Sequence, residues 1–201
     1  MTECGPLISY NEWSTTKPNS CGKAIPCTTV KIDSPDPENI VGEILVKGTN
    51  VMKGYYKNSE ITDATISPDG WLHTGDLGII DKDGFIFIKG RSKNMILSGS
   101  GQNIYPEEIE SKINNLPYVL ESLIVERNGK LHALIVPDKD SAEANGLTPD
   151  KLESIMSQNQ QYINTHLPNY MTVSKFVLHD GEFEKTAKKS IKRFIYSVSE
   201  N

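Results

Sequence analysis

The sequence predicts an α+β fold in two parts, a β-rich part over residues 1–92 and a smaller α+β part over residues 93–201. Up to residue 92, short segments rich in β-branched and aromatic residues alternate with turn sequences of Pro, Asp and Gly. Beyond it, helix-start signals appear between the strand patterns. A chain of 201 residues is long enough for one or two domains with a buried core.

In the first part, four segments alternate in the manner of strands: residues 27–33, 42–48, 71–80 and 85–90. Asp81-Lys-Asp-Gly84 joins the last two across four polar residues, which predicts a hairpin. A short helix is expected from Ser59 to Ala64.

The second part mixes helix and strand signals. Pro106 followed by acidic residues is typical of a helix start, and Thr148 is a suitable N-cap for a long amphipathic helix. Asn128-Gly129 lies between two apolar runs, as in a β-hairpin. The expected elements are a helix from Pro106, a hairpin of 119–127 with 130–137, a helix from Thr148 to before Pro168, a strand over 172–180 and a helix over 188–196.

Composition excludes several function classes. The net charge of −5 argues against a general nucleic-acid or membrane-surface binder, and no apolar run approaches the ~20 residues of a membrane-spanning helix. The opening MTECGPLISY lacks the pattern of a signal peptide. The three cysteines lack paired zinc-ligand spacing, so reduced thiols in a cytoplasmic protein are expected.

Asp76, in the stretch His73–Gly78, is the first candidate for a functional residue. It follows a glycine at the end of an apolar segment. An aspartate there could cap a turn, or its paired carboxylate oxygens could accept hydrogen bonds from the two vicinal hydroxyls of a ribose.

Four segments in order decide between these readings: MTECGP (1–6), GEILVKGTNVMKGYY (42–56), GWLHTGDLG (70–78) and GRSKNMILSGSGQNIYPEEIE (90–110). Together they resemble the adenylate-forming, AMP-binding enzymes, and specifically the acyl-CoA synthetase branch similar to bacterial long-chain fatty-acid–CoA ligases. The resemblance implies a distorted barrel-like, β-rich subdomain over 1–92, truncated at its N-terminus, and a mobile α+β cap domain over 93–201.

The resemblance also implies the chemistry. In this family a carboxylate attacks the α-phosphate of ATP to give an acyl-adenylate and pyrophosphate, and the thiol of CoA then displaces AMP. The expected ligands are ATP or AMP, Mg²⁺ and CoA, with small-molecule substrates and no nucleic-acid partner. Cations are needed because a carboxylate and a phosphate repel each other.

The resemblance assigns nucleotide contacts to Thr2, Asp76 and Arg91, and Mg²⁺ to Glu3. Asp76 would accept hydrogen bonds from the ribose, and Arg91 would contact ribose or phosphate. A surface ion pair is the alternative for Arg91, and a disordered terminus for Thr2 and Glu3.

The resemblance places Lys93 at the family's hinge, a residue whose backbone dihedral angles change between two conformations of the enzyme. An exposed loop lysine without that role is the alternative. The glycine-rich loop would line the path of CoA, and its members are Gly99, Ser100, Gly101, Gln102 and Asn103. It is not a phosphate-binding P-loop, because no Lys-Ser/Thr pair follows it. A plain hairpin turn is its alternative.

The segment GEFEKTAKKSIKRF (181–194) resembles the family's adenylation motif, Pro-Lys-Thr-x-x-Gly-Lys-(apolar)-Lys-Arg. An ungapped alignment puts Ser190 at the second lysine, and a serine cannot supply a positive charge. Lys189 after a one-residue shift, or Lys188, is the expected catalytic cation; a solvated basic surface remains the alternative.

The family's upstream phosphate loop is missing, so this looks like the C-terminal portion of a synthetase that is inactive alone. Two alternatives remain: an adenylation domain that loads a carrier protein, and a non-catalytic nucleotide-binding or docking module. Neither the acid substrate nor the oligomeric state follows from the sequence.

Overall fold

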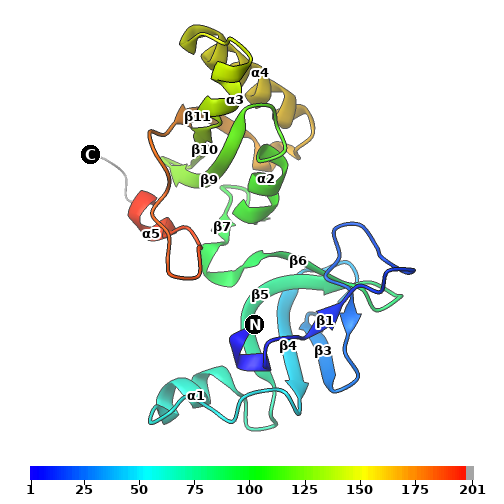
Figure 1. Cartoon of the computed structure of the whole chain (residues 1–201). Helices are drawn as coiled ribbons and strands as arrows, with labels where there is room; N and C mark the ends of the chain where they lie inside the picture. Colours follow the sequence, from blue (N-terminus) through cyan, green and yellow to red (C-terminus); the bar gives the residue numbers. More distant parts are fainter. Residues whose placement is uncertain (198–201) are drawn as a thin grey trace. The chain divides into compact units, whose positions relative to one another are not determined.

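A computed structural model describes residues 1–197, which form two compact units that meet between Lys93 and Asn94 (Figure 1). We call Met1–Lys93 unit 1 and the residues from Asn94 onward unit 2, and each is described by itself.

Unit 1 is built on an antiparallel sheet of four strands in the order β3-β4-β5-β6. This sheet is open, with β3 and β6 at its edges, and no closed barrel forms among residues 1–197. The elements of unit 1 are η1 (Thr2–Cys4), β1 (Ser9–Tyr10), β2 (Lys23–Ala24), β3 (Thr28–Asp33), β4 (Gly42–Gly48), α1 (Ser59–Thr65), β5 (Leu72–Ile80) and β6 (Ile86–Arg91).

The core of unit 1 lies on one face of this sheet. Its buried members are Cys4, Ile32, Ile44, Val46, Leu72 and Ile86. Cys4 comes from η1, so the start of the chain is packed against the sheet through this side chain. The hairpin between β5 and β6 is closed by Asp81, whose Oδ1 accepts the backbone N–H of Phe85 at 2.9 Å.

Unit 2 is built on a three-stranded sheet in the order β11-β10-β9. Strand β10 is antiparallel to β9 and parallel to β11. The connection from β10 to the parallel strand β11 must be a crossover, and α3 and α4 form it. The elements are η2 (Ser92–Asn94), which spans the boundary, β7 (Ile96–Leu97), β8 (Asn103–Ile104), α2 (Pro106–Ile113), β9 (Val119–Arg127), β10 (Lys130–Pro137), α3 (Lys139–Ala144), α4 (Pro149–Thr165), η3 (Asn169–Met171), β11 (Val173–Leu178) and α5 (Arg193–Tyr196).

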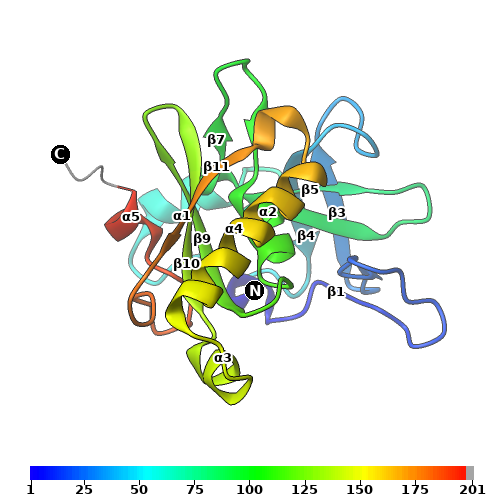
Figure 2. The same ribbon diagram turned by 90° about the horizontal axis from the view of Figure 1, so that it is seen from above.

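The sheet of unit 2 is covered on both faces (Figure 2). Helices α2 and α4 cover one face and bury a large cluster that includes Ile109, Ile135 and Met156. The segment after β11 returns over the other face, where Phe183 packs on Leu123, Val125, Leu134 and Val136.

Most predicted elements form where they were expected. Strand β4 covers the predicted residues 42–48, α2 begins at Pro106, and the side chain of Thr148 caps α4 by accepting the N–H of Lys151. The final helix is wrong over residues 188–192: only Arg193–Tyr196 is helical. Residues 185–191 instead form a hairpin, and Lys189 has a φ of +60°, which a right-handed helix cannot contain.

No helix among residues 1–197 combines the length and the apolarity that crossing a membrane would require.

Candidate functional site

Asp76 and Arg91 form an ion pair across the sheet of unit 1. Asp76 lies in β5 opposite Arg91 in β6, and Arg91 Nε is 2.7 Å from Asp76 Oδ1. The Asp76 side chain is 24% exposed and that of Arg91 is 49% exposed, so both groups remain accessible to a ligand. Asp76 and Arg91, which were both predicted to contact a nucleotide, are thus neighbours in the sheet.

One buried and two partly buried hydrogen bonds fix the backbone around Asp76. Thr74 is buried, and its Oγ1 donates to the carbonyl of Ile44 at 2.7 Å and accepts the N–H of Asp76 at 3.0 Å. Gly75 has a φ of +69°, a conformation that favours glycine. Its N–H donates to Glu43 Oε1 at 2.9 Å.

Sequence reasoning did not single out Thr74 or Glu43, although both lie within the motif segments quoted above. Their contacts join residues about 30 positions apart. Such pairing follows from the register of β4 and β5, which the sequence alone does not give.

Thr2 and Glu3 lie in η1, which Cys4 holds against the core of unit 1. The carbonyl of Glu3 accepts the N–H of Met52 at 2.8 Å, and its Oε1 accepts the hydroxyl of Tyr55 at 3.3 Å. Partial burial and, secondly, the Glu3 carboxylate raise the pKa of Tyr55, so its phenol remains a donor. Thr2 is exposed beside them.

The donor set around Glu3 fits one mode of Mg²⁺ binding. Residues 1–197 contain no cluster of three or more His, Cys, Asp or Glu side chains suited to hold a metal by themselves. Mg²⁺ commonly binds through one or two carboxylates together with substrate phosphates and water. A lone Glu3 carboxylate on an ordered turn fits this mode.

The glycine-rich loop is the turn of a β-hairpin formed by β7 and β8. Ser98 closes it: its N–H donates to the carbonyl of Gln102, and its Oγ accepts the N–H of Gln102, both at 2.9 Å. Residues Gly99 to Asn103 are exposed. The loop therefore has the hairpin form that was the plain alternative, and its role toward CoA stays a prediction.

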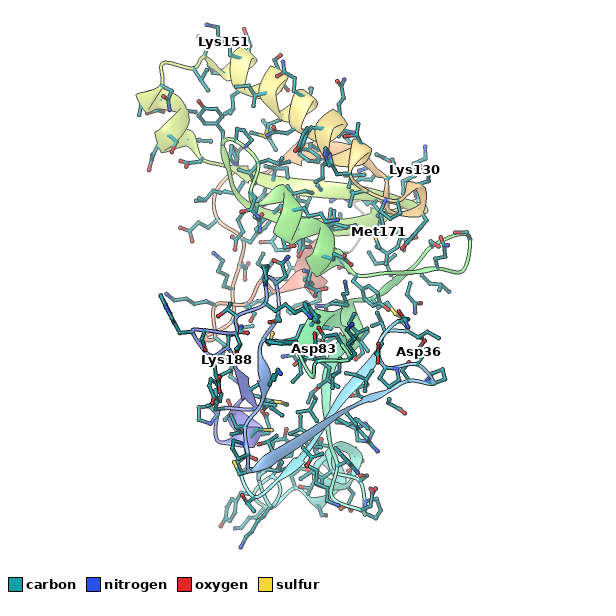
Figure 3. The ribbon with its side chains drawn as sticks, turned by 90° about the vertical axis from the view of Figure 1, so that its right-hand side faces the viewer. Asp36, Asp83, Lys130, Lys151, Met171 and Lys188 are labelled. Carbon is teal, nitrogen blue, oxygen red and sulfur yellow. The ribbon has the colours of Figure 1, made fainter. Side chains whose placement is uncertain are left out.

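One side of this loop borders a hollow of about 220 Å³ in unit 2. Ser98 and Ser100 from the loop, Lys130 from the β9–β10 hairpin, and Tyr170, Thr172 and Ser174 contribute to its lining. Figure 3 labels Lys130 at the end of that hairpin.

The basic segment near the C-terminus forms a hairpin in which Lys185 pairs with Ile191. We call residues 185–191 the lysine hairpin; Figure 3 labels Lys188 in it. The N–H of Lys189 donates to the carbonyl of Thr186 at 2.8 Å, and Lys188, Lys189 and Ser190 are all exposed.

The backbone conformation of Lys189 helps to decide how residues 181–194 align with the adenylation motif. Its φ of +60° lies in the left-handed region that glycine adopts readily, and the resembled motif has a glycine at this position when no gap is introduced. This conformation argues against a one-residue shift and puts Ser190 at the position of the motif's second lysine. That Lys189 or Lys188 supplies the cation stays a prediction.

Replacing Lys189 by Gly is expected to stabilise the chain by about 0.5–1 kcal/mol. Relief of a left-handed lysine is worth about 1–2 kcal/mol, partly offset by the larger freedom of glycine in the unfolded chain. Urea unfolding of the two proteins measures the difference. Ala187→Gly is the matched control, expected to destabilise; a loss of stability in Lys189→Gly would contradict the strain argument.

The predicted residues fall in separate groups. Thr2, Glu3, Asp76 and Arg91 belong to unit 1, and the glycine-rich loop and the lysine hairpin belong to unit 2. Lys93, the predicted hinge, is exposed and is the last residue of unit 1, within η2.

Comparison with known proteins finds two family models along the chain. The model described as "AMP-binding enzyme" matches residues 1–56, and "AMP-binding enzyme C-terminal domain" matches residues 93–196, over half of the chain.

Among curated relatives, the long-chain-fatty-acid–CoA ligase of Salmonella typhimurium is 40% identical, with 76% of this chain and 28% of that protein covered. The 2-succinylbenzoate–CoA ligase of Bacillus cytotoxicus is 44% identical, with 62% and 27% covered. The chain thus spans less than a third of the length of these relatives.

Among solved structures, the o-succinylbenzoate coenzyme A synthetase of Bacillus subtilis in complex with AMP matches with a TM-score of 0.81 at 30% identity. The match covers 99% of this chain and 40% of that protein.

Proposed function

This chain belongs to the AMP-binding enzyme family, and from that membership we propose that it serves an AMP-forming acid–CoA ligase whose substrate is a fatty acid. The ligase would convert an acid, ATP and CoA into acyl-CoA, AMP and pyrophosphate. Its named relatives are acid–CoA ligases that differ in their acid.

The observation that carries the proposal is the geometry around Asp76. A partly exposed carboxylate follows Gly75 in β5, hydrogen bonds of Thr74 fix the backbone there, and Arg91 Nε lies 2.7 Å from the carboxylate. A turn-capping aspartate would direct its side-chain oxygens to nearby backbone N–H groups. Here the side chain of Thr74 accepts the backbone N–H of Asp76, and the Asp76 carboxylate forms an ion pair with Arg91.

Each of the four candidate site residues of unit 1 has a role in this proposal. Asp76 accepts hydrogen bonds from the two ribose hydroxyls, and Arg91 orients that carboxylate while presenting its remaining N–H donors to the ribose or phosphate. Thr2 contributes a hydroxyl near the α-phosphate. Glu3 would hold Mg²⁺, which when bound offsets the negative charge of the phosphates.

The residues of unit 2 serve the two steps in turn. The lysine hairpin presents positive charge during formation of the acyl-adenylate. The exposed glycine-rich loop, Gly99 to Asn103, lines the path of the thiol during thioester formation, because glycine lets a thin ligand approach the backbone closely. Lys93 is the hinge between these arrangements.

The proposal is tested by ATP–pyrophosphate exchange with the protein translated from the complete reading frame, supplied with acids of graded chain length and with 2-succinylbenzoate. Exchange that requires an acid and is fastest with long-chain fatty acids is the expected result. Fastest exchange with 2-succinylbenzoate would overturn the fatty-acid assignment, and no exchange with any acid would overturn the ligase.

A non-catalytic nucleotide-binding module is a second candidate, favoured by Ser190 at the position of the motif's lysine. In that case the same protein would bind AMP in equilibrium dialysis, with the Asp76 carboxylate required, and yet show no exchange with any acid.

A further inference from the structure

Two glutamates of α2 hold one arginine from the C-terminal segment. Arg193 Nη1 donates to Glu110 Oε1 at 2.8 Å, and Arg193 Nη2 donates to Glu110 Oε2. Arg193 Nη2 also lies 3.6 Å from Glu107 Oε1. The planar guanidinium thus makes the two-bond contact with one carboxylate that gives such pairs a fixed orientation.

The pair is largely removed from water. The Glu110 side chain is 9% exposed and that of Arg193 is 20% exposed, and Glu110 Oε1 also accepts the N–H of Ile124 at 2.6 Å. Burial raises the pKa of Glu110 even though Arg193 acts to lower it. A buried charge without its partner is strongly unfavourable, so Arg193 is held where Glu110 lies.

Glu107 extends this cluster to the beginning of unit 2. Its Oε1 accepts a hydrogen bond from Asn94 Nδ2 at 2.6 Å, and the same oxygen faces Arg193. Its Oε2 is buried, with no hydrogen-bond partner among the described residues. Glu107 Oε1 therefore contacts both Asn94 and Arg193, and it joins the two residues.

Arg193 in turn adjoins the lysine hairpin, which ends at Ile191. The other end of the hairpin is held by Lys185, whose Nζ is 3.0 Å from Glu121 Oε2 on β9. The exposed residues Lys188, Lys189 and Ser190 lie between these two anchors.

We propose that Glu107 and Arg193 are positioning residues that couple Asn94, the first residue of unit 2, to the lysine hairpin. A displacement of Asn94 changes its hydrogen bond to Glu107. The position of Glu107 in turn affects the position of Arg193 and of the adjoining end of the lysine hairpin. The inference rests on the proposed function in one respect: the coupling matters to catalysis because the hairpin acts in the first step and Asn94 follows the hinge.

Amide hydrogen exchange on the 201-residue chain tests the coupling without any activity. The amides of Thr186, Lys189 and Lys192 are hydrogen-bonded in and beside the hairpin and report its opening. Asn94→Ala is expected to speed their exchange about ten-fold, the effect of losing a hydrogen bond to a charged group. Glu107→Ala should do the same, and Asn94→Ala added to Glu107→Ala should have no further effect.

The control is Asn115→Ala, which removes a 2.6 Å hydrogen bond at the other end of α2 and should leave hairpin exchange unchanged. Glu107→Gln keeps an acceptor oxygen, so its hairpin amides should exchange more slowly than those of Glu107→Ala. Unchanged hairpin exchange in Asn94→Ala, or additive effects of Asn94→Ala and Glu107→Ala, would overturn the coupling and leave Glu107 a structural residue.

Kinetics of the protein from the complete reading frame separate this inference from the proposed function. Glu107→Ala is expected to slow pyrophosphate exchange more than it slows thioester formation from a supplied acyl-adenylate. Equal slowing of both would overturn the positioning role, whereas absence of both reactions in the unmodified protein would overturn the proposed function alone.

Discussion

Replacing Asp76 by Asn is expected to weaken AMP binding at least a hundred-fold in the protein from the complete reading frame. The amide keeps the shape of the carboxylate but has one acceptor oxygen, so only one ribose hydroxyl can still donate to it. Each hydrogen bond to a charged group contributes roughly 1.5–3 kcal/mol, so the loss of one charge-assisted bond and the weakening of the other to a neutral bond account for a change of this size. Equilibrium dialysis with labelled AMP measures it.

Unfolding would not explain such a loss. The Asp76–Arg91 pair is partly exposed, and ion pairs of this kind contribute about 0–1 kcal/mol to stability. The matched control is Asp33→Asn, an exposed aspartate at the end of β3 in the same sheet, expected to bind AMP normally. AMP affinity within three-fold of the unmodified protein in Asp76→Asn would exclude the ribose contact.

The second large effect is a gain: Ser190→Lys is expected to raise the rate of acyl-adenylate formation about a hundred-fold. A preorganised charge or donor at a developing negative charge typically changes a rate by about 10²–10³-fold. The left-handed backbone of Lys189 puts residue 190 where the resembled motif has its lysine. Pyrophosphate release in a single turnover measures the rate.

Position is separated from charge by Ala187→Lys, which adds the same charge to the same exposed turn and should change the rate little. If Ser190→Lys has no effect while Lys189→Gly abolishes the reaction, the shifted alignment with Lys189 as the cation is correct. If Lys188→Ala alone abolishes it, Lys188 supplies the charge.

Local signals explain which parts of the fold were predictable. Thr148 caps α4 and Pro106 begins α2, because capping depends on residues within one turn of each other. Asn128-Gly129 specifies the β9–β10 hairpin for the same reason. The final helix was overestimated because the basic composition of 188–192 is compatible with a helix, whereas the pairing of Lys185 with Ile191 makes a turn there.

The candidate site divides in the same way. Asp76 and Arg91 could be singled out because each lies in a short motif, and the pairing of β5 with β6 brings them together. The bond of Arg193 to Glu110 joins residues 83 positions apart, and nothing in either local sequence specifies the partner. Long-range polar contacts of this kind follow from the packed structure.

The two-sided cover of the sheet in unit 2 has a consequence for biosynthesis. Ribosomes deliver β9 and β10 well before Phe183, which later covers Leu123, Val125, Leu134 and Val136. A nascent chain released before Phe183 emerges would expose this apolar face of the sheet to solvent and to other nascent chains. Translation stalled or stopped in this interval therefore yields an aggregation-prone product, although every helix that covers the opposite face is already made.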